Sequence, residues 1–359
     1  MTSDVPNLRF PEFQGEWEKT KFGDIATGFD YGMNAAAKNY DGVNKYIRIT
    51  DIDEASSTYT DKDIVSPDGV LTDNYLVNNR DILLARTGAS TGKSYLYKQS
   101  DGKLYYAGFL IRANVTTHDP YFVFSQLHTH RYWRWVSIMS ARSGQPGINS
   151  QEYSSFPIYT TSIEEESKIA KLLSLLDERI ATQNKIIEDL KKLKSAIIEM
   201  EYGQMAKSIS HIGDFIEQIS KRNKDSAIKN VLSVSNSQGF IQQSEQFENR
   251  IVASDDTSNY KIVERNDFAF NPARINVGSI ARLTTFERGI VSPMYICFRT
   301  KDILFPEYLD YYFESKQFFT EIQKRLEGSV RQCLSFDGLC NIPLCVPAIG
   351  ECKINCVRL

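Results

Sequence analysis

Apolar residues recur at alternating steps of four and three between residues 163 and 203, and this pattern predicts one long helix. Ser162 is a suitable N-cap, and three glutamates follow in the first turn, where the helix macrodipole favours acids. A heptad stripe sustained over this length is typical of a coiled-coil helix, which needs partners along its apolar face. The residues that we expect to contact a partner helix are Leu173, Leu176, Ile180, Ile187, Leu190 and Ile197.

The regions on either side of this helix mix short strand patterns with turns, and the second region echoes the first. Residues 22–25 (Phe-Gly-Asp-Ile) are matched by residues 212–215 (Ile-Gly-Asp-Phe). A charged turn that runs into an apolar strand occurs at residues 79–84 and again 186 residues later, and Gly92 falls on Gly278 at the same spacing. These matches predict two copies of a domain of about 150 residues.

The expected fold class is α+β, with two similar mixed α/β domains joined by one long coiled-coil-type helix. In the last residues Glu351, Lys353 and Ile354 resemble the beginning of the long helix, after which the sequences diverge, so we expect no second long helix. The expected segments are a first domain at 1–161, the central helix at 162–205, a second domain at 206–346 and the start of a distal helical region at 347–359.

Composition narrows the class of protein. The 359 residues are 42% hydrophobic and 24% charged with a net charge of −3, so a nucleic-acid surface has to be local rather than global. The chain begins without an apolar leader and has no run long enough to span a membrane, which favours a cytoplasmic protein. All six cysteines lie at or after Cys297 and lack the paired C-x-x-C spacing of structural zinc sites, so we expect free thiols.

A polar, glycine-containing loop follows the central strand of the first copy, and its sequence is Arg-Thr-Gly-Ala-Ser-Thr-Gly-Lys-Ser at residues 86–94. It nearly matches a nucleotide-binding P-loop, but Thr87 stands where that motif needs glycine, and residues 95–97 read as a strand instead of a helix. An NTP-binding enzyme is therefore a less favoured alternative. Arginine, threonine, lysine and free backbone amides suit phosphate and base-edge contacts with DNA, and a solvated hairpin loop is the other interpretation.

Catalytic motifs are lacking. The four histidines have no carboxylate or cysteine at metal-ligand spacing, and Asn271-Pro272 only begins an adenine-methyltransferase motif, which Ala273 and Arg274 interrupt. We therefore predict a non-enzymatic chain without catalytic or metal-binding residues. The polar loop residues that we expect to contact DNA are Arg48, Thr50, Arg86, Thr87, Lys93, Arg142 and Gln145 in the first copy, and Ser235, Asn271, Arg274, Asn276, Arg331 and Gln332 in the second.

Taken together, these features resemble the specificity (S) subunits of type I restriction-modification enzymes. The resemblance extends from residue 5 to about residue 351. It is carried by Pro6–Phe13, Trp17 and Gly23–Ile25 at the start, by Ile163–Ile180 in the helix, and by Arg331–Leu339 and Ile342–Leu344 at the end.

The resemblance implies two target recognition domains, each reading one half of a bipartite site on double-stranded DNA. It also implies modification subunits that use S-adenosylmethionine to methylate adenine, and restriction subunits that use ATP and magnesium, while this chain holds no cofactor. The expected departure from the family is the missing distal helix, which leaves homodimerisation through the central helix, or an inactive remnant, as alternatives. The DNA sequence, the base-contacting residues and the oligomeric state do not follow from this sequence.

Overall fold

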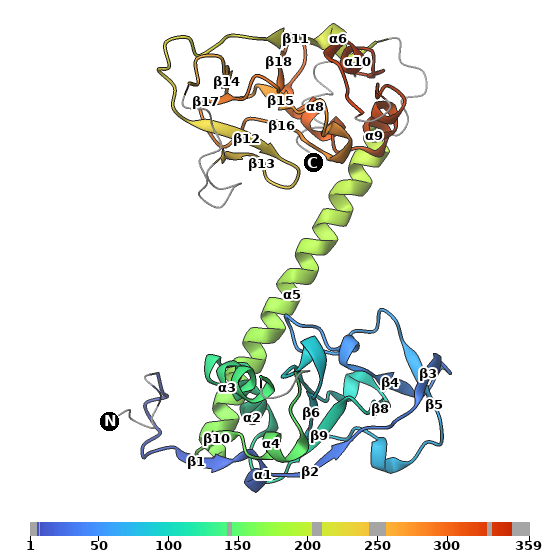
Figure 1. Ribbon diagram of the computed structural model, residues 1–359, viewed down its shortest axis with the longest axis vertical. Coiled ribbons are helices and arrows are strands. Elements are labelled where there is room, and N and C mark those ends of the chain that lie inside the picture. The colour runs from blue at the N-terminus through green and yellow to red at the C-terminus, as the bar shows by residue number, and fades with distance from the viewer. Residues whose placement is uncertain are drawn as a thin grey trace. The chain divides into compact units, whose positions relative to one another are not determined.

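The computed structural model describes residues 6, 8–141, 146–202, 210–243, 256–328 and 332–346. The chain forms two compact units, Met1–Gln183 and Asn184–Leu359 (Figure 1). The predicted long helix is confirmed as α5 (Ile163–Tyr202), whose residues are divided between the two units. The domain boundaries given above treat this helix as a separate segment and stay predictions.

The first unit is built around a four-stranded sheet with the order β2-β9-β6-β7, in which all neighbours are antiparallel. Three two-stranded sheets, β1-β10, β3-β5 and β4-β8, accompany it. The elements are β1 (Glu18–Lys21), α1 (Phe22–Ile25), β2 (Ala26–Tyr31), β3 (Ala36–Asn39), β4 (Lys45–Ile47), β5 (Val65–Asp68), β6 (Asp81–Ala85), β7 (Ser94–Leu96), β8 (Leu104–Tyr106), β9 (Leu110–Val115), α2 (Pro120–Gln126), α3 (His130–Ser140), α4 (Ser150–Ser154) and β10 (Pro157–Thr160).

The second unit has a four-stranded antiparallel sheet with the order β11-β18-β15-β16 and another sheet with the order β13-β12-β17-β14. Its elements are α6 (Ile212–Phe215), β11 (Ile216–Ile219), β12 (Val231–Ser235), β13 (Gly239–Gln242), β14 (Lys261–Glu264), β15 (Phe268–Phe270), β16 (Ile280–Arg282), β17 (Arg288–Val291), β18 (Ile296–Thr300), α8 (Pro306–Tyr312), α9 (Lys316–Gln323) and α10 (Phe336–Cys340).

The internal repeat is visible in the topology. Strands β2, β6, β7 and β9 occupy the same places in their sheet as β11, β15, β16 and β18 do in theirs. A parallel pair accompanies each sheet, β4 with β8 in the first unit and β12 with β17 in the second. Three short helices follow the last strand of each sheet, α2, α3 and α4 in one unit and α8, α9 and α10 in the other. The two units therefore share one mixed α/β framework.

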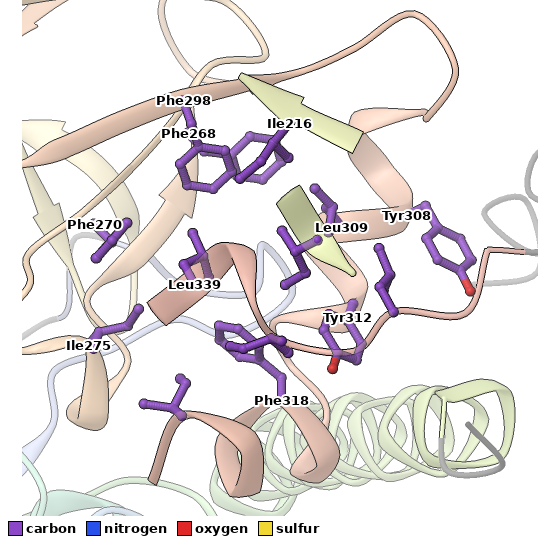
Figure 2. Close-up of a cluster of buried hydrophobic side chains, with 14 of the residues drawn as sticks. Ile216, Phe268, Phe270, Ile275, Phe298, Tyr308, Leu309, Tyr312, Phe318 and Leu339 are labelled. Atoms are coloured by element: carbon purple, nitrogen blue, oxygen red, sulfur yellow. The ribbon is translucent and has the colours of Figure 1, made fainter. Parts of the chain in front are cut away.

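Each central strand is buried on both faces, which explains its continuous apolar sequence. In β6, Ile82 and Leu84 belong to a cluster that includes side chains of the short helices, while Leu83 faces a second cluster with side chains of β4 and β8. In β15 the same alternation places Phe268 and Phe270 in the cluster of the helical side, which Figure 2 shows. The core of each unit therefore lies on both sides of its sheet.

The first turn of α5 is fastened to the first unit by two buried glutamates. Glu165 accepts hydrogen bonds from Arg9 Nε (2.7 Å) and from Thr161 Oγ1 (2.7 Å). Glu166 accepts from the backbone N–H groups of Asp119 (3.0 Å) and Thr161 (3.1 Å), and it contacts His118 Nδ1 at 2.9 Å. The sequence predicted only a favourable interaction of these glutamates with the helix macrodipole. In the structure their hydrogen bonds also attach the start of α5 to the first unit.

The C-terminal end of α5 belongs to the core of the second unit. Ile198 and Tyr202 are buried in its larger apolar cluster, and the Tyr202 hydroxyl donates to the backbone oxygen of Tyr308 at 2.8 Å. Lys194 Nζ lies 2.7 Å from a carboxylate oxygen of Glu314. The helix is therefore held by packing and by polar contacts at each of its ends.

The prediction of free thiols is confirmed for Cys297, Cys333, Cys340 and Cys345, whereas Cys352 and Cys356 lie outside the described residues. Within the described ranges, no three histidine, cysteine, aspartate or glutamate side chains are grouped so that they could hold a metal ion. None of the helices in that part of the chain is long and apolar enough to cross a membrane.

Candidate nucleic-acid interface

A pocket of about 610 Å³, whose lining is more apolar than polar, opens in the first unit beside the start of β9. We call it the first pocket. Three of the predicted DNA-contacting residues, Arg48, Thr50 and Arg86, line it. They come from two segments that are far apart in sequence and are brought together because β4 pairs with β8, and β6 with β9. The other lining residues are Tyr31, Gly32, Met33, Asn34, Ala35, Ala37, Tyr46, Ile49, Ala107, Gly108 and Phe109.

Arg86 is the best placed of these side chains for contact with a base. It follows the last residue of β6, and its guanidinium lies 4.7 Å from the centre of the Tyr31 ring. Its Nε donates to the backbone oxygen of Gly108 at 3.0 Å, and the terminal nitrogens make no hydrogen bond to another described residue. A guanidinium fixed by stacking and one hydrogen bond, with its terminal donors unused, suits bidentate contact with guanine.

Arg48 is held by acids in the structure. Its guanidinium donates to both carboxylate oxygens of Asp51, at 2.9 Å and 2.8 Å, and to Asp63 Oδ2 at 3.1 Å. Hydrogen bonding to Asp51 raises the pKa of the Arg48 side chain above its ordinary value. Thr50 is exposed at the rim and lies 3.4 Å from Asp51 Oδ1. Thr50 is therefore accessible, whereas Nε and Nη2 of Arg48 are already engaged by acidic partners.

Two other predicted residues of the first unit, Thr87 and Lys93, do not line the first pocket. Thr87 lines a smaller neighbouring cavity of about 280 Å³ together with Arg86, Asn149 and Glu152. Lys93 is mostly buried, and its Nζ lies 3.3 Å from Glu54 Oε2. Arg142 and Gln145 lie outside the described residues.

The loop between β6 and β7 does not have the geometry of a P-loop. Residues Gly88–Ser90 form a single 3₁₀ turn, and the chain then enters β7 (Ser94–Leu96). The strand predicted after the loop is therefore confirmed. A P-loop needs a helix at this place, because helix N-terminal amides bind the phosphates.

A pocket of about 590 Å³ lies at the corresponding place in the second unit, and we call it the second pocket. The predicted residues Ser235, Asn271 and Arg274 line it. Asn271 directly follows β15, is buried, and accepts a hydrogen bond from the backbone of Ala273 at 3.1 Å. Arg274 is exposed, and its guanidinium makes no hydrogen bond or ion pair to any residue that the structure describes.

The chemistry of the second pocket differs from that of the first. Hydroxyl and amide side chains predominate around Arg274, and Met294 and Tyr295 complete the wall. The polar lining residues are Ser233, Ser235, Asn236, Ser237, Gln243, Asn271, Ser279 and Ser292. Of the remaining predicted residues, Asn276 and Gln332 do not line this pocket, and Arg331 lies outside the described residues.

Several lining residues were missed from the sequence. Tyr31 lies on β2, which reaches β6 only through β9, so no local pattern connects it with Arg86. Phe109 and Met294 sit in the turns before β9 and β18, where the two copies match with a shift of one residue. This shifted match is the sequence signal from which Phe109 and Met294 could have been identified as corresponding residues. On α3, Trp133 is 43% exposed, whereas Trp135 packs against the apolar cluster of the first unit.

A second candidate surface is the apolar stripe of α5. Of the six predicted residues, Leu176, Ile180, Ile187 and Leu190 are exposed, whereas Leu173 and Ile197 are half-buried. Leu172, Leu175, Ile186 and Leu193 are also exposed and widen this face. Apolar side chains exposed in a row along a helix are typical of a protein-binding surface.

Each copy of the duplicated framework carries an arginine-containing pocket at the same place. Residues 14–192 match the model of a family described as the type I restriction modification DNA specificity domain. The chain belongs to this family, and the resemblance found in the sequence is confirmed.

Two known proteins are similar to this chain. The specificity subunit of the type I restriction enzyme MjaVIII from Methanocaldococcus jannaschii is 26% identical over 200 residues, which cover 55% of this chain. The match spans 43% of that relative, less than half of its length. The crystal structure of the type I restriction-modification system S subunit from M. genitalium has a TM-score of 0.63 at 13% identity, and covers 99% of this chain and 91% of that one. This second likeness confirms the fold.

Proposed function

We propose that this chain is the DNA-targeting subunit of a type I restriction-modification complex. Each unit binds one half of a bipartite, asymmetric site on double-stranded DNA, and the chain itself recognises DNA without catalysing a reaction. The observation that carries this proposal is the pair of arginine-containing pockets at corresponding places of two units with the same strand order. Family membership and the similar specificity subunit support it.

The residues of the two pockets suit different base edges. Arg86 offers the paired donors that recognise guanine, whereas Asn236, Gln243 and Asn271 carry amides of the kind that recognise adenine. Two pockets with different donors and acceptors favour a site whose halves differ in sequence. The guanidinium of Arg274 at the second pocket, which no described residue engages, suits either a phosphate or a base contact.

Partner proteins would bind the exposed stripe of α5. We propose that modification subunits dock there, because a stripe with Ile180 and Leu190 exposed fits the apolar face of another helix. In this assignment S-adenosylmethionine, ATP and magnesium belong to the modification and restriction subunits, and the complex works in the cytoplasm. A second copy of this chain bound through α5 is the alternative, which sedimentation of the isolated chain at several concentrations distinguishes.

The test is base-resolved adenine methylation in a host that expresses this chain together with its modification subunit. An asymmetric bipartite motif is the expected result. A palindromic motif would show that only one kind of unit reads the DNA. Absence of any motif, with the complex assembled, would refute the proposal.

Single substitutions connect each pocket with one half of the motif. Arg86→Ala should relax one position in one half and weaken specific binding by about 1–3 kcal/mol, and Arg274→Ala should act only on the other half. Arg134→Ala is a matched control, because Arg134 is an exposed arginine on α3 that lines neither pocket. Loss of specificity in both halves from one substitution would contradict this assignment.

A further inference from the structure

The same tight turn leads into β9 in the first unit and into β18 in the second. In the first unit the N–H of Leu110 donates to the backbone oxygen of Ala107 at 2.8 Å. In the second the N–H of Tyr295 donates to the backbone oxygen of Ser292 at 3.1 Å. Because each bond joins the first and fourth residues of its turn, the third positions correspond, and Phe109 and Met294 occupy them.

Each turn exposes one large apolar side chain. Phe109 and Met294 are both 56% exposed, and they line the first and second pockets respectively. The backbone oxygen of Phe109 accepts from the N–H of Arg86 at 3.0 Å, so the backbone of this turn is joined to the residue that we assign to base recognition. Neither side chain is needed to fill a core cluster.

We propose that Phe109 and Met294 are apolar base-contacting residues, one for each half of the DNA site. This inference rests on the proposed function and adds to it a contact without charge. An exposed apolar side chain gains free energy when DNA covers it, and the available apolar surfaces are the faces of bases and the thymine methyl group. Phosphates offer no such surface, so these residues would contribute to sequence recognition and not to general attraction.

The test compares DNA binding by the assembled complex of this chain with its modification subunit. The probe is a fluorescent duplex that carries the motif obtained from the methylation experiment. The variants are Phe109→Ala, Met294→Ala and Phe109→Leu. The matched controls are Phe319→Ala on α9 and Ile303→Ala between β18 and α8, because these two side chains are both 50% exposed and line neither pocket.

Each alanine variant should bind the duplex about tenfold more weakly, as expected for the loss of one apolar base contact. Phe109→Leu should keep part of the affinity, and the controls should bind as the unmodified chain does. The salt dependence separates this contact from a charged one. Loss of a phosphate contact makes the negative slope of log K for binding against log salt concentration shallower by about one, whereas loss of an apolar contact leaves this slope unchanged.

Three results would overturn the inference while leaving the proposed function intact. The first is that the alanine variants bind DNA within about twofold of the unmodified chain. The second is that an alanine variant reduces the salt dependence of binding. The third is that a variant assembles less well with the modification subunit, while the complex that does form binds DNA normally. The last result would assign the turns to a protein partner. If the unmodified complex methylates no motif, the proposed function fails first, and the inference fails with it.

Discussion

Glu166 offers a direct test of how the long helix is fastened to the first unit. Its side chain is fully buried at the start of α5. One carboxylate oxygen, Oε1, accepts from the Thr161 N–H and contacts His118 Nδ1, while Oε2 accepts from the Asp119 N–H. Asp119 is also the N-cap of α2. The substitution Glu166→Gln keeps the size of this side chain and replaces one acceptor by an amide donor.

The expected loss follows from these contacts. The amide oxygen can take the position of Oε1, which has two neighbours, and the NH₂ group then faces the Asp119 N–H, which is a donor. A buried donor left without an acceptor costs about 1–3 kcal/mol, and the loss of a charged acceptor adds to this. We therefore expect the first unit to lose about 2–3 kcal/mol of its free energy of unfolding.

Tryptophan fluorescence during urea unfolding measures this loss selectively, because Trp17, Trp133 and Trp135 all lie in the first unit. Glu164→Gln is the matched control, since this exposed neighbour occupies the same first turn and leaves the buried contacts intact. A change below about 0.5 kcal/mol for Glu166→Gln, or equal changes for the two variants, would refute the reasoning.

Three further predictions follow from other contacts. Gly92→Ala should destabilise the first unit by roughly 1–2 kcal/mol more than Gly278→Ala destabilises the second, in urea unfolding monitored by circular dichroism and by tryptophan fluorescence. Both glycines have positive φ, 93° and 90°, but an added Cβ at Gly92 would lie 2.7 Å from a Val136 methyl, whereas at Gly278 nothing lies closer than 4.0 Å. Hydrogen bonding to Arg9 holds the pKa of Glu165 below its usual range. The stabilisation that Glu165 provides is therefore complete above its unfolded-state pKa of about 4.3, and it is lost as the pH falls through the lower folded-state pKa. The stability difference between the unmodified chain and Glu165→Gln, measured by tryptophan fluorescence in urea at several pH values, should therefore shrink in acid, and a constant difference would contradict the assignment. Ile180→Glu should reduce co-purification of the modification subunit at least tenfold with unchanged circular dichroism, whereas Thr182→Glu on the opposite helix face should not.

The elements that the sequence predicts well are those set by local spacing. The stripe that begins at Ile169 defines α5, because one helical period fixes which side chains share a face. The repeat spacing identifies the second unit, because insertions between the matched segments are few. A buried central strand such as β6 reads as a continuous apolar run, and the structure buries it on both faces.

The site was harder to predict because its contacts join distant segments. Glu54 reaches Lys93 only through tertiary folding, so Lys93 looks free in the sequence, and the second acceptor of Arg48, Asp63, lies 15 residues away from it. Arg86 was identified, but its stacking partner Tyr31 was not, because β2 and β6 are connected only through β9. Charge and residue type therefore suggest candidates, and strand pairing determines which side chains meet at a pocket.

The two units keep the residues that hold the backbone and change those that line the pockets. Asp81 and Asp267 are both buried at the start of the central strand, each accepts a hydrogen bond from the backbone N–H three residues upstream, and burial raises the pKa of both carboxyl groups. In contrast, Arg86 corresponds to Pro272 at the same spacing of 186 residues. Because Arg86, Arg274, Phe109 and Met294 lie outside the strands and belong to no core cluster, they can differ without a change of fold. Under the proposed function, this separation of framework from pocket allows one duplicated fold to bind two different half-sites.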